Sequence, residues 1–155
     1  MTTLLLEATL DHLGKLVSFD TRNPPRAISA RGGIFDYLRA HLPGFTVEVV
    51  DHGAGAVSLY AVRGVPKLLF NVHLDTVPDS PAWSADPLVM RRLDDRVVGL
   101  GVCDIKGAAA ALLAAASATQ GDAAFLFSSD EEANDPRCID AFLARKIPYD
   151  AVLVA

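Results

Sequence analysis

The sequence predicts an α/β protein in which helices flank a mixed, mostly parallel β-sheet. Two observations lead to this prediction. Residues 68–72, 123–127 and 152–154 form largely apolar runs of strand length, which are typical of strands buried on both faces of a parallel sheet. Hydrophobic residues make up 51% of the chain and charged residues 21%, a composition that suits a compact domain and not a disordered one. At 155 residues, the chain is long enough for one domain with a substantial core.

The first half of the chain is expected to form two helices and an antiparallel hairpin ahead of the buried strand at 68–73. Two prolines and Asn23 end the first helix, and the adjacent Gly32 and Gly33 weaken the middle of the second. The expected elements are a helix from Thr2 or Thr3 to about Val17, a loop at 18–25, a helix at 27–42 and strands at 45–50 and 56–62 around a turn at 52–55.

The second half is expected to alternate strands with helices. The expected elements are a loop at 79–87, a hairpin of 89–93 and 96–100, a helix at 107–119, a strand at 123–127, a helix at 135–146 and a strand at 150–155. The helix at 107–119 is apolar nearly all round, so we expect it to be buried between layers. Because the chain ends inside a strand of buried type, we expect it to be truncated.

Charge and composition exclude several kinds of partner. The net charge is −5 and there is no basic cluster, so no nucleic-acid partner is expected. The longest apolar block, residues 108–116, is about half a membrane span, and the N-terminus has no signal-peptide pattern, so no membrane partner is expected. Cys103 and Cys138 are too few and too far apart for a disulfide scaffold. Free thiols indicate a cytoplasmic protein.

Polar side chains follow several of the predicted strands. His73 and Asp75 stand two positions apart at the end of the first apolar run, so their side chains share a face. Asp104 follows a second predicted strand, and the pair Glu131-Glu132 follows a third. Ligands bind in open α/β sheets at the carboxyl ends of the strands. One histidine and several carboxylates converging there predict a metal site.

Each of these residues alone also has an ordinary structural explanation. His73 fits a histidine whose hydrogen bonds are satisfied within the fold. Asp104 fits the N-cap of the following helix, and Glu131-Glu132 fits an exposed acidic loop. Only their combination favours metal binding over these alternatives.

The residue types also suggest individual roles. Zinc binds histidine nitrogen and carboxylate oxygen, and two neighbouring metal ions can share one carboxylate. Asp104, between the other two motifs, is the natural bridge. Of the adjacent pair, one glutamate can bind metal while the other accepts a proton from water. Asp75 has the spacing to orient the His73 ring.

Three motifs, NVHLDTVP at 71–78, GLGVCDIKG at 99–107 and SSDEEAND at 128–135, resemble those of the acetylornithine deacetylase, succinyl-diaminopimelate desuccinylase and carboxypeptidase family of co-catalytic metal amidohydrolases. The resemblance extends from about residue 4 to residue 155. It implies two divalent ions, zinc or cobalt. The site residues it implies are His73 and Glu132 as ligands of the two metals, Asp104 as their bridge, Glu131 as general base, Asp75 as the residue orienting His73, and a cis peptide bond between Asp104 and Ile105.

The resemblance also implies a reaction. Glu131 would deprotonate a metal-bridging water, which attacks an amide carbonyl, and would return the proton to the leaving amine. The expected substrate is a small N-acyl amino acid such as N-acetylcitrulline or N-acetylornithine, in arginine biosynthesis. Within the same class, an aminoacylase or a dipeptidase is an alternative.

The chain departs from the family pattern beyond the last strand. Members carry a further acidic ligand directly after that strand, a distal histidine, and an inserted lid domain through which they form homodimers. These parts are absent, so residues 1–155 are expected to be the N-terminal part of the catalytic domain. We expect this chain alone to bind one metal ion or none and to be inactive. The alternative from another class is a non-catalytic globular fragment or interaction module.

Overall fold

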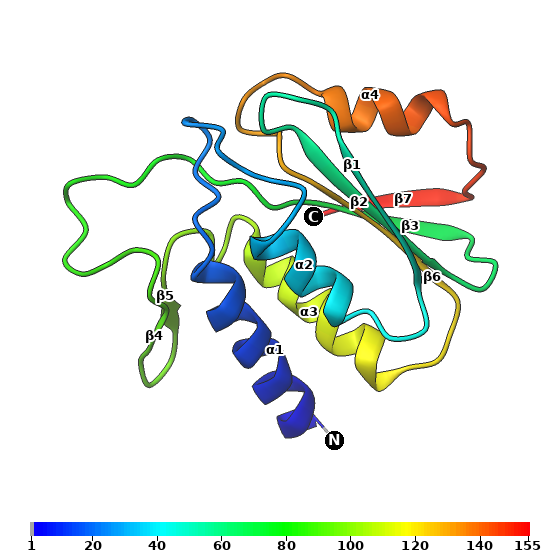
Figure 1. Ribbon diagram of the computed structural model, residues 1–155. Coiled ribbons are helices and arrows are strands. Elements are labelled where there is room, and N and C mark those ends of the chain that lie inside the picture. The colour runs from blue at the N-terminus through cyan, green and yellow to red at the C-terminus, as the bar shows by residue number, and fades with distance from the viewer. Residues whose placement is uncertain (1) are drawn as a thin grey trace.

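The computed structural model describes residues 2–155, which form a mixed five-stranded sheet covered by helices (Figure 1). The strand order is β1-β2-β6-β3-β7. The strands are β1 (Thr46–Asp51), β2 (Val57–Arg63), β3 (Leu68–His73), β6 (Ala123–Ser128) and β7 (Ala151–Val154), and a separate two-stranded ribbon consists of β4 (Arg91–Arg92) and β5 (Val97–Val98). The predicted α/β class is confirmed.

Parallel and antiparallel pairings occupy different parts of the sheet. β3 pairs in parallel with both β6 and β7, whereas β2 pairs antiparallel with β1 and with β6. Two of the four pairings are therefore parallel, because the predicted hairpin adds its two strands to the same sheet. Within the parallel part, His73 at the end of β3 is in register with Ser128 at the end of β6. The loops that follow these two strands consequently start side by side.

Helices cover both faces of the sheet. Three helices, α1 (Thr2–Val17), α2 (Gly33–Ala40) and α3 (Lys106–Ala118), lie on one face, and α4 (Arg137–Ala144) lies on the other (Figure 1). Helix α3 is only partly buried, contrary to the expectation from its apolar sequence: one face is buried, with Ala109, Leu113 and Ala116, whereas Ala111 is exposed. None of the helices in residues 2–155 is both long enough and apolar enough to cross a membrane.

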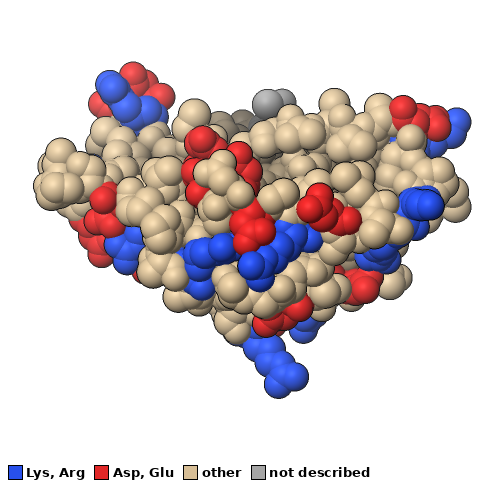
Figure 2. All heavy atoms as spheres, turned by 90° about the horizontal axis from the view of Figure 1, so that it is seen from above, with Lys and Arg blue, Asp and Glu red and all other residues tan. Residues whose placement is uncertain are grey.

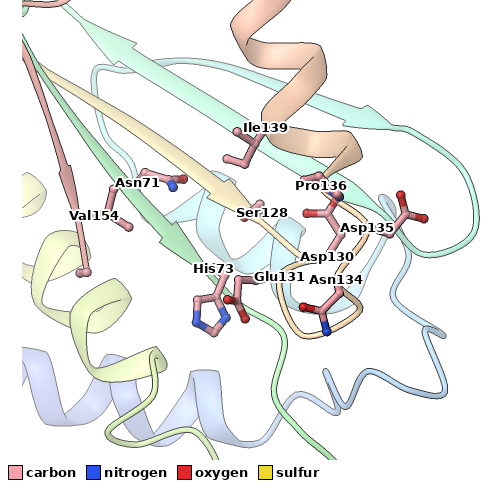
Figure 3. A pocket seen from close by; sticks show the side chains of 11 residues that line it. Asn71, His73, Ser128, Asp130, Glu131, Asn134, Asp135, Pro136, Ile139 and Val154 are labelled. Atoms are coloured by element: carbon pink, nitrogen blue, oxygen red, sulfur yellow. The ribbon is translucent and has the colours of Figure 1, made fainter.

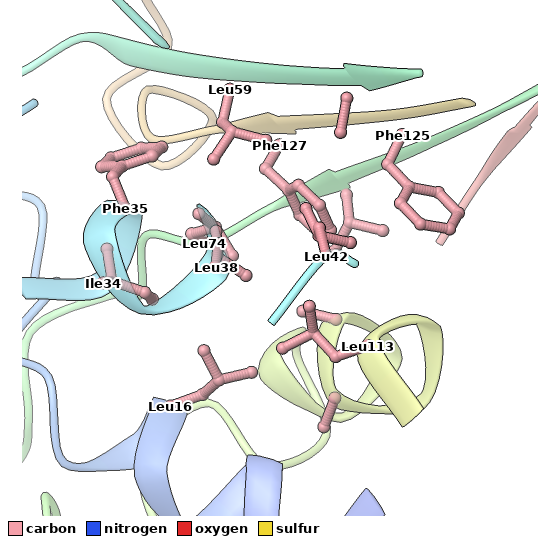
Figure 4. Close-up of a cluster of buried hydrophobic side chains, with 14 of the residues drawn as sticks. Leu16, Ile34, Phe35, Leu38, Leu42, Leu59, Leu74, Leu113, Phe125 and Phe127 are labelled. Atoms are coloured by element: carbon pink, nitrogen blue, oxygen red, sulfur yellow. The ribbon is translucent and has the colours of Figure 1, made fainter. Parts of the chain in front are cut away.

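The main hydrophobic core lies between the sheet and the three helices on one face. Figure 4 shows Leu16 of α1, Leu38 of α2 and Leu113 of α3 pointing toward Leu59 and Phe127 of the sheet. All five side chains are fully buried. Burial of each such side chain contributes about 1.5–3 kcal/mol to stability, so this contact fixes the strands on which the site depends.

Helices α2 and α4 and the two strands of the hairpin are shorter than predicted. Helix α2 starts at Gly33 and not near residue 27, because Gly32 and Gly33 have positive φ values of 74° and 59°, which keep the preceding chain out of a helix. The hairpin around Asp94-Asp95 forms, but its strands are only two residues long each. It is also separate from the central sheet.

Acidic and basic side chains are intermixed on the face shown in Figure 2. Ion pairs of the fold include Asp135 with both Arg26 and Arg137, and Glu48 with Arg145, so opposite charges are paired in the folded chain.

Candidate metal centre

The register of β3 and β6 places one histidine beside two glutamates. His73 is the last residue of β3, and Glu131 and Glu132 follow the end of β6. Ligand atoms of these three side chains all lie within 4.8 Å of one another. Figure 3 shows the His73 ring next to Glu131 at the ends of the strands. Two of the three predicted motifs therefore meet in space.

Asp104 joins the group from a different direction than predicted. The strand before it, β5, lies outside the central sheet, so Asp104 reaches the site from the loop that precedes α3. Its Oδ1 lies 3.1 Å from His73 Nε2, and its side chain is 75% exposed. The peptide bond to Ile105 is cis, as the resemblance implied. Asp104 does not cap α3, whose N-cap residue is Ile105, so the structural alternative for this residue is wrong.

Asp75 holds the other side of the His73 ring. Its side chain is fully buried, and its Oδ1 lies 3.5 Å from His73 Nδ1. Its Oδ2 accepts a hydrogen bond of 3.0 Å from the backbone N–H of Glu132. Burial alone raises the pKa of Asp75, but His73, Asn23 and the Glu132 N–H stabilise the carboxylate and together lower the pKa below its usual value. A buried, ionised Asp75 therefore faces the ring.

The carboxylates change the ionisation of their neighbours. Burial lowers the pKa of His73, but the negative charges of Asp75 and Glu131 outweigh burial and raise it. Burial and repulsion from Glu131 raise the pKa of Glu132. Closely spaced carboxylates repel one another, and a cation among them relieves this repulsion.

The donor set fits a divalent metal ion. Zinc bonds of about 2.0–2.2 Å place two tetrahedral ligands roughly 3.4 Å apart, close to the 3.1 Å between His73 Nε2 and Asp104 Oδ1. His73 Nδ1 lies 3.1 Å from the backbone carbonyl oxygen of Asp75 and 3.5 Å from its carboxylate Oδ1, which leaves Nε2 free to bind a metal. A carboxylate or a backbone carbonyl on the second nitrogen is the usual support of a metal-binding histidine. The residues present could therefore hold metal at His73, with Asp104, Glu131 and Glu132 beside it as carboxylate donors.

A pocket of about 460 Å³ opens beside this centre (Figure 3). Its lining includes Asn71, His73, Glu131, Asn134 and Ile139. Of the two neighbouring glutamates, Glu131 faces this pocket and Glu132 does not line it. The volume is within the range of small-molecule sites.

Sequence reasoning assigned no role to three buried polar residues, of which Asn23 contacts the centre and Lys106 and Asp130 lie near its residues in the sequence. Asn23 is buried and donates a hydrogen bond to Asp75, although its loop carried no signal beyond two prolines. The Lys106 side chain is buried and donates to the carbonyl oxygen of Phe19, and burial lowers its pKa to about 8. Asp130 accepts a hydrogen bond from the backbone N–H of Cys138 at the start of α4. These contacts depend on the tertiary fold.

Comparison with known sequences identifies relatives of the chain. Residues 69–155, more than half of the chain, match peptidase family M20/M25/M40. The chain is 83% identical to an N-acetyl-L-citrulline deacetylase of Xanthomonas campestris over 99% of its own length and 42% of the relative. It is 39% identical to a succinyl-diaminopimelate desuccinylase of Sphingopyxis alaskensis over 70% of its length and 32% of that protein. The chain therefore spans less than half the length of these relatives.

Solved structures share the fold. Human carnosine dipeptidase 1 superimposes with a TM-score of 0.80 at 21% identity, over 99% of this chain and 39% of that one. An M20 family metallo-carboxypeptidase from Sulfolobus solfataricus has a TM-score of 0.76 at 20% identity, over 94% and 36% of the two chains.

Proposed function

This chain belongs to peptidase family M20/M25/M40, and from that membership we propose that it is part of the catalytic domain of a metal-dependent hydrolase that removes the acyl group from an N-acyl amino acid. The observation that carries the proposal is the convergence of His73, Asp104, Glu131 and Glu132 at one edge of the sheet. The activity is proposed for a protein with the full length of the relatives, since the chain spans 42% of the deacetylase.

We assign His73 and Glu132 as ligands of two metal ions and Asp104 as the bridge between them. When bound, the metals would supply Lewis acidity, which lowers the pKa of water and polarises the amide carbonyl. Zinc or cobalt suits imidazole and carboxylate ligands. In this chain the ligand set is incomplete, because each metal would have one ligand of its own plus the shared Asp104. We therefore propose that the chain alone binds metal weakly and is inactive.

Glu131 is proposed as the general base. Its side chain lines the pocket beside His73 and is exposed, so a substrate amide and a water molecule can reach it. Glu131 accepts the proton of the attacking water and later donates it to the nitrogen of the leaving amine. Asp75 remains ionised beside His73 Nδ1 and keeps the ring in a fixed orientation. This division of roles follows from the different positions of Glu131 and Glu132.

The favoured substrate is N-acetylcitrulline, because of the 83% identity to a protein of that activity. N-acetylornithine and N-succinyl-diaminopimelate are the related candidates, the latter from the desuccinylase relatives. A role in arginine biosynthesis and homodimerisation of the longer protein belong to the same proposal. Both cysteines are free, which agrees with the proposed cytoplasmic location.

The test is hydrolysis of a substrate panel by the 155-residue chain and by the full-length product of its gene. We expect the full-length protein to release acetate from N-acetylcitrulline in a metal-dependent way and the chain alone to be inactive. Faster hydrolysis of a dipeptide would move the assignment to a dipeptidase. No hydrolysis of any substrate by metal-loaded full-length protein would favour a non-catalytic module.

A further inference from the structure

Asn23 occupies a buried position between two loops of the metal centre. It lies in the connection between α1 and α2 and is 1% exposed. Its Nδ2 donates hydrogen bonds to Asp75 Oδ2 at 2.9 Å and to the carbonyl oxygen of Ser129 at 3.3 Å. These two acceptors fix the orientation of the amide, since the reverse orientation would place Oδ1 against a carboxylate and a carbonyl.

The carbonyl oxygen of the Asn23 side chain differs from its nitrogen in hydrogen bonding. Among residues 2–155, Asn23 Oδ1 is buried without a hydrogen-bond partner. Burying an acceptor in this way costs free energy, and an apolar residue of similar size would avoid the cost. The side-chain hydrogen bonds of this amide are therefore those that its Nδ2 donates to Asp75 and Ser129.

The segment that carries Asn23 is fixed along its length. The Thr21 hydroxyl donates to the carbonyl oxygen of Leu74 at 2.8 Å, and Lys106 Nζ donates to that of Phe19 at 2.9 Å. The backbone N–H of Asn23 donates to the carbonyl oxygen of Thr76 at 2.8 Å. These bonds attach the segment to the loop after β3 and to the start of α3. Asn23 is thus held in place independently of its side chain.

We propose that Asn23 is a positioning residue of the metal centre. It fixes the Asp75 carboxylate so that Oδ1 faces His73 Nδ1, and through Ser129 it joins the loop after β3 to the loop that carries Glu131 and Glu132. His73 Nε2 then stays directed toward Asp104. This inference rests on the proposed function of the site and adds to it a residue outside the three sequence motifs.

Two substitutions separate the positioning role from a contribution to the fold. Asn23→Leu removes the donor and keeps the branching of the side chain at Cγ, and Asn23→Asp places a second carboxylate next to Asp75. Removing such a supporting hydrogen bond lowers metal affinity by about 10–100-fold. Thr21→Val is the matched control, because it removes one buried hydrogen bond from the same segment without touching Asp75.

The experiment measures zinc affinity of the full-length protein by chelator competition, together with kcat, KM and thermal unfolding of the metal-free form. We expect Asn23→Leu and Asn23→Asp to weaken zinc binding by about 10-fold or more and to lower kcat more than they change KM. Thr21→Val should lower thermal stability and keep the zinc affinity of the wild type. If Asn23→Leu does not fold, the same measurements are made on Asn23→Ser, which is a smaller change.

Two outcomes would overturn the inference. Zinc affinity equal to the wild type in the Asn23 variants would overturn it and leave the proposed function intact. So would equal losses of affinity in Asn23→Leu and Thr21→Val, since these would indicate a general effect on the fold. A wild-type protein that neither binds zinc nor hydrolyses an N-acyl amino acid would overturn the proposed function as well.

Discussion

His73 Nε2 lies 3.1 Å from Asp104 Oδ1, while Nδ1 of the same ring lies 3.5 Å from Asp75 Oδ1. The ring therefore stands between two carboxylates that differ in environment. Asp75 is fully buried, whereas the Asp104 side chain is 75% exposed. The buried carboxylate suits a support for the ring, and the exposed one suits a metal ligand that is open to water and substrate.

Metal binding should stabilise the protein through His73. An ion that binds only the folded state raises stability by about 2.7 kcal/mol when its concentration is 100 times its Kd. We expect zinc or cobalt to raise the Tm of the full-length protein and His73→Ala to abolish this shift. His52→Ala is the matched control, because this histidine contacts Ser58 in the hairpin and is not one of the proposed metal ligands. An unchanged metal-induced shift in His73→Ala would place the metal elsewhere.

The two neighbouring glutamates should respond differently to the same substitution. Glu131→Gln removes the proposed base, so kcat should fall by about 10²–10⁴-fold with metal content retained. Glu132→Gln removes a proposed ligand, so metal affinity itself should fall. Glu48→Gln, which disrupts only an exposed ion pair with Arg145, should change neither quantity. Kinetics and metal analysis of the three variants in the full-length protein make the comparison. A near-normal kcat in Glu131→Gln would contradict the base assignment.

A side chain at Gly107 should disturb the position of Asp104. An added Cβ would lie 2.5 Å from the carbonyl oxygen of Val102, which is closer than such atoms approach. We expect Gly107→Ala to shift the loop before α3, lowering stability by about 1–3 kcal/mol and weakening metal binding. Gly121→Ala is the control, since nothing lies within 4 Å of its added Cβ. Equal stability and affinity in the two variants would show that the loop accommodates the methyl group.

Lys106 should make stability depend on pH. Burial lowers the pKa of Lys106 from 10.5 to about 8, so between these values the unfolded chain binds more protons than the folded chain. The free energy of unfolding therefore gains a contribution that rises with pH in this window, by up to about 3 kcal/mol. Below about pH 8 the folded state bears the full cost of burying the ammonium group.

The difference in unfolding free energy between the wild type and Lys106→Met isolates this contribution, because the other titrating groups contribute equally to both proteins. The stability of the wild type relative to this variant should increase as the pH rises from about 8 to 10.5, as measured by urea unfolding at several pH values. Lys67→Met, at a lysine whose side chain is 82% exposed, should show no such trend relative to the wild type. A pH-independent difference for Lys106→Met would mean that its ammonium group is solvated in the folded protein.

The positions of the central strands and of helix α3 were predictable because each shows its pattern in the residues themselves, but β7, predicted as a buried strand, is an exposed strand at the edge of the sheet. The apolar run before His73 became β3, and the Ala- and Leu-rich stretch became α3. The start of α2 was not predictable, because the helical pattern extends upstream of it. Two adjacent glycines with positive φ decide where that helix begins.

The meeting of the candidate site residues was predictable, and its geometry was less so. His73, Glu131 and Glu132 lie together as expected, because β3 and β6 are parallel and in register at their ends. Asp104 was expected at a third strand end of the same sheet, but it arrives from the loop before α3. The order of segments along the chain does not determine which of them pair in a sheet. The position of β5 outside the central sheet could therefore not be predicted from the sequence.

The sequence by itself determined the fold class, the main strands and the residues with metal-binding chemistry, because hydrophobic period and residue type are local properties. Only the tertiary structure decided which groups support those residues. Asn23 lies outside the three motifs, and Lys106 lies within one of them without metal-binding chemistry of its own; both are buried polar side chains whose partners lie far along the chain. A buried polar group must find its partners across the fold, and those partners are defined only when the chain is packed.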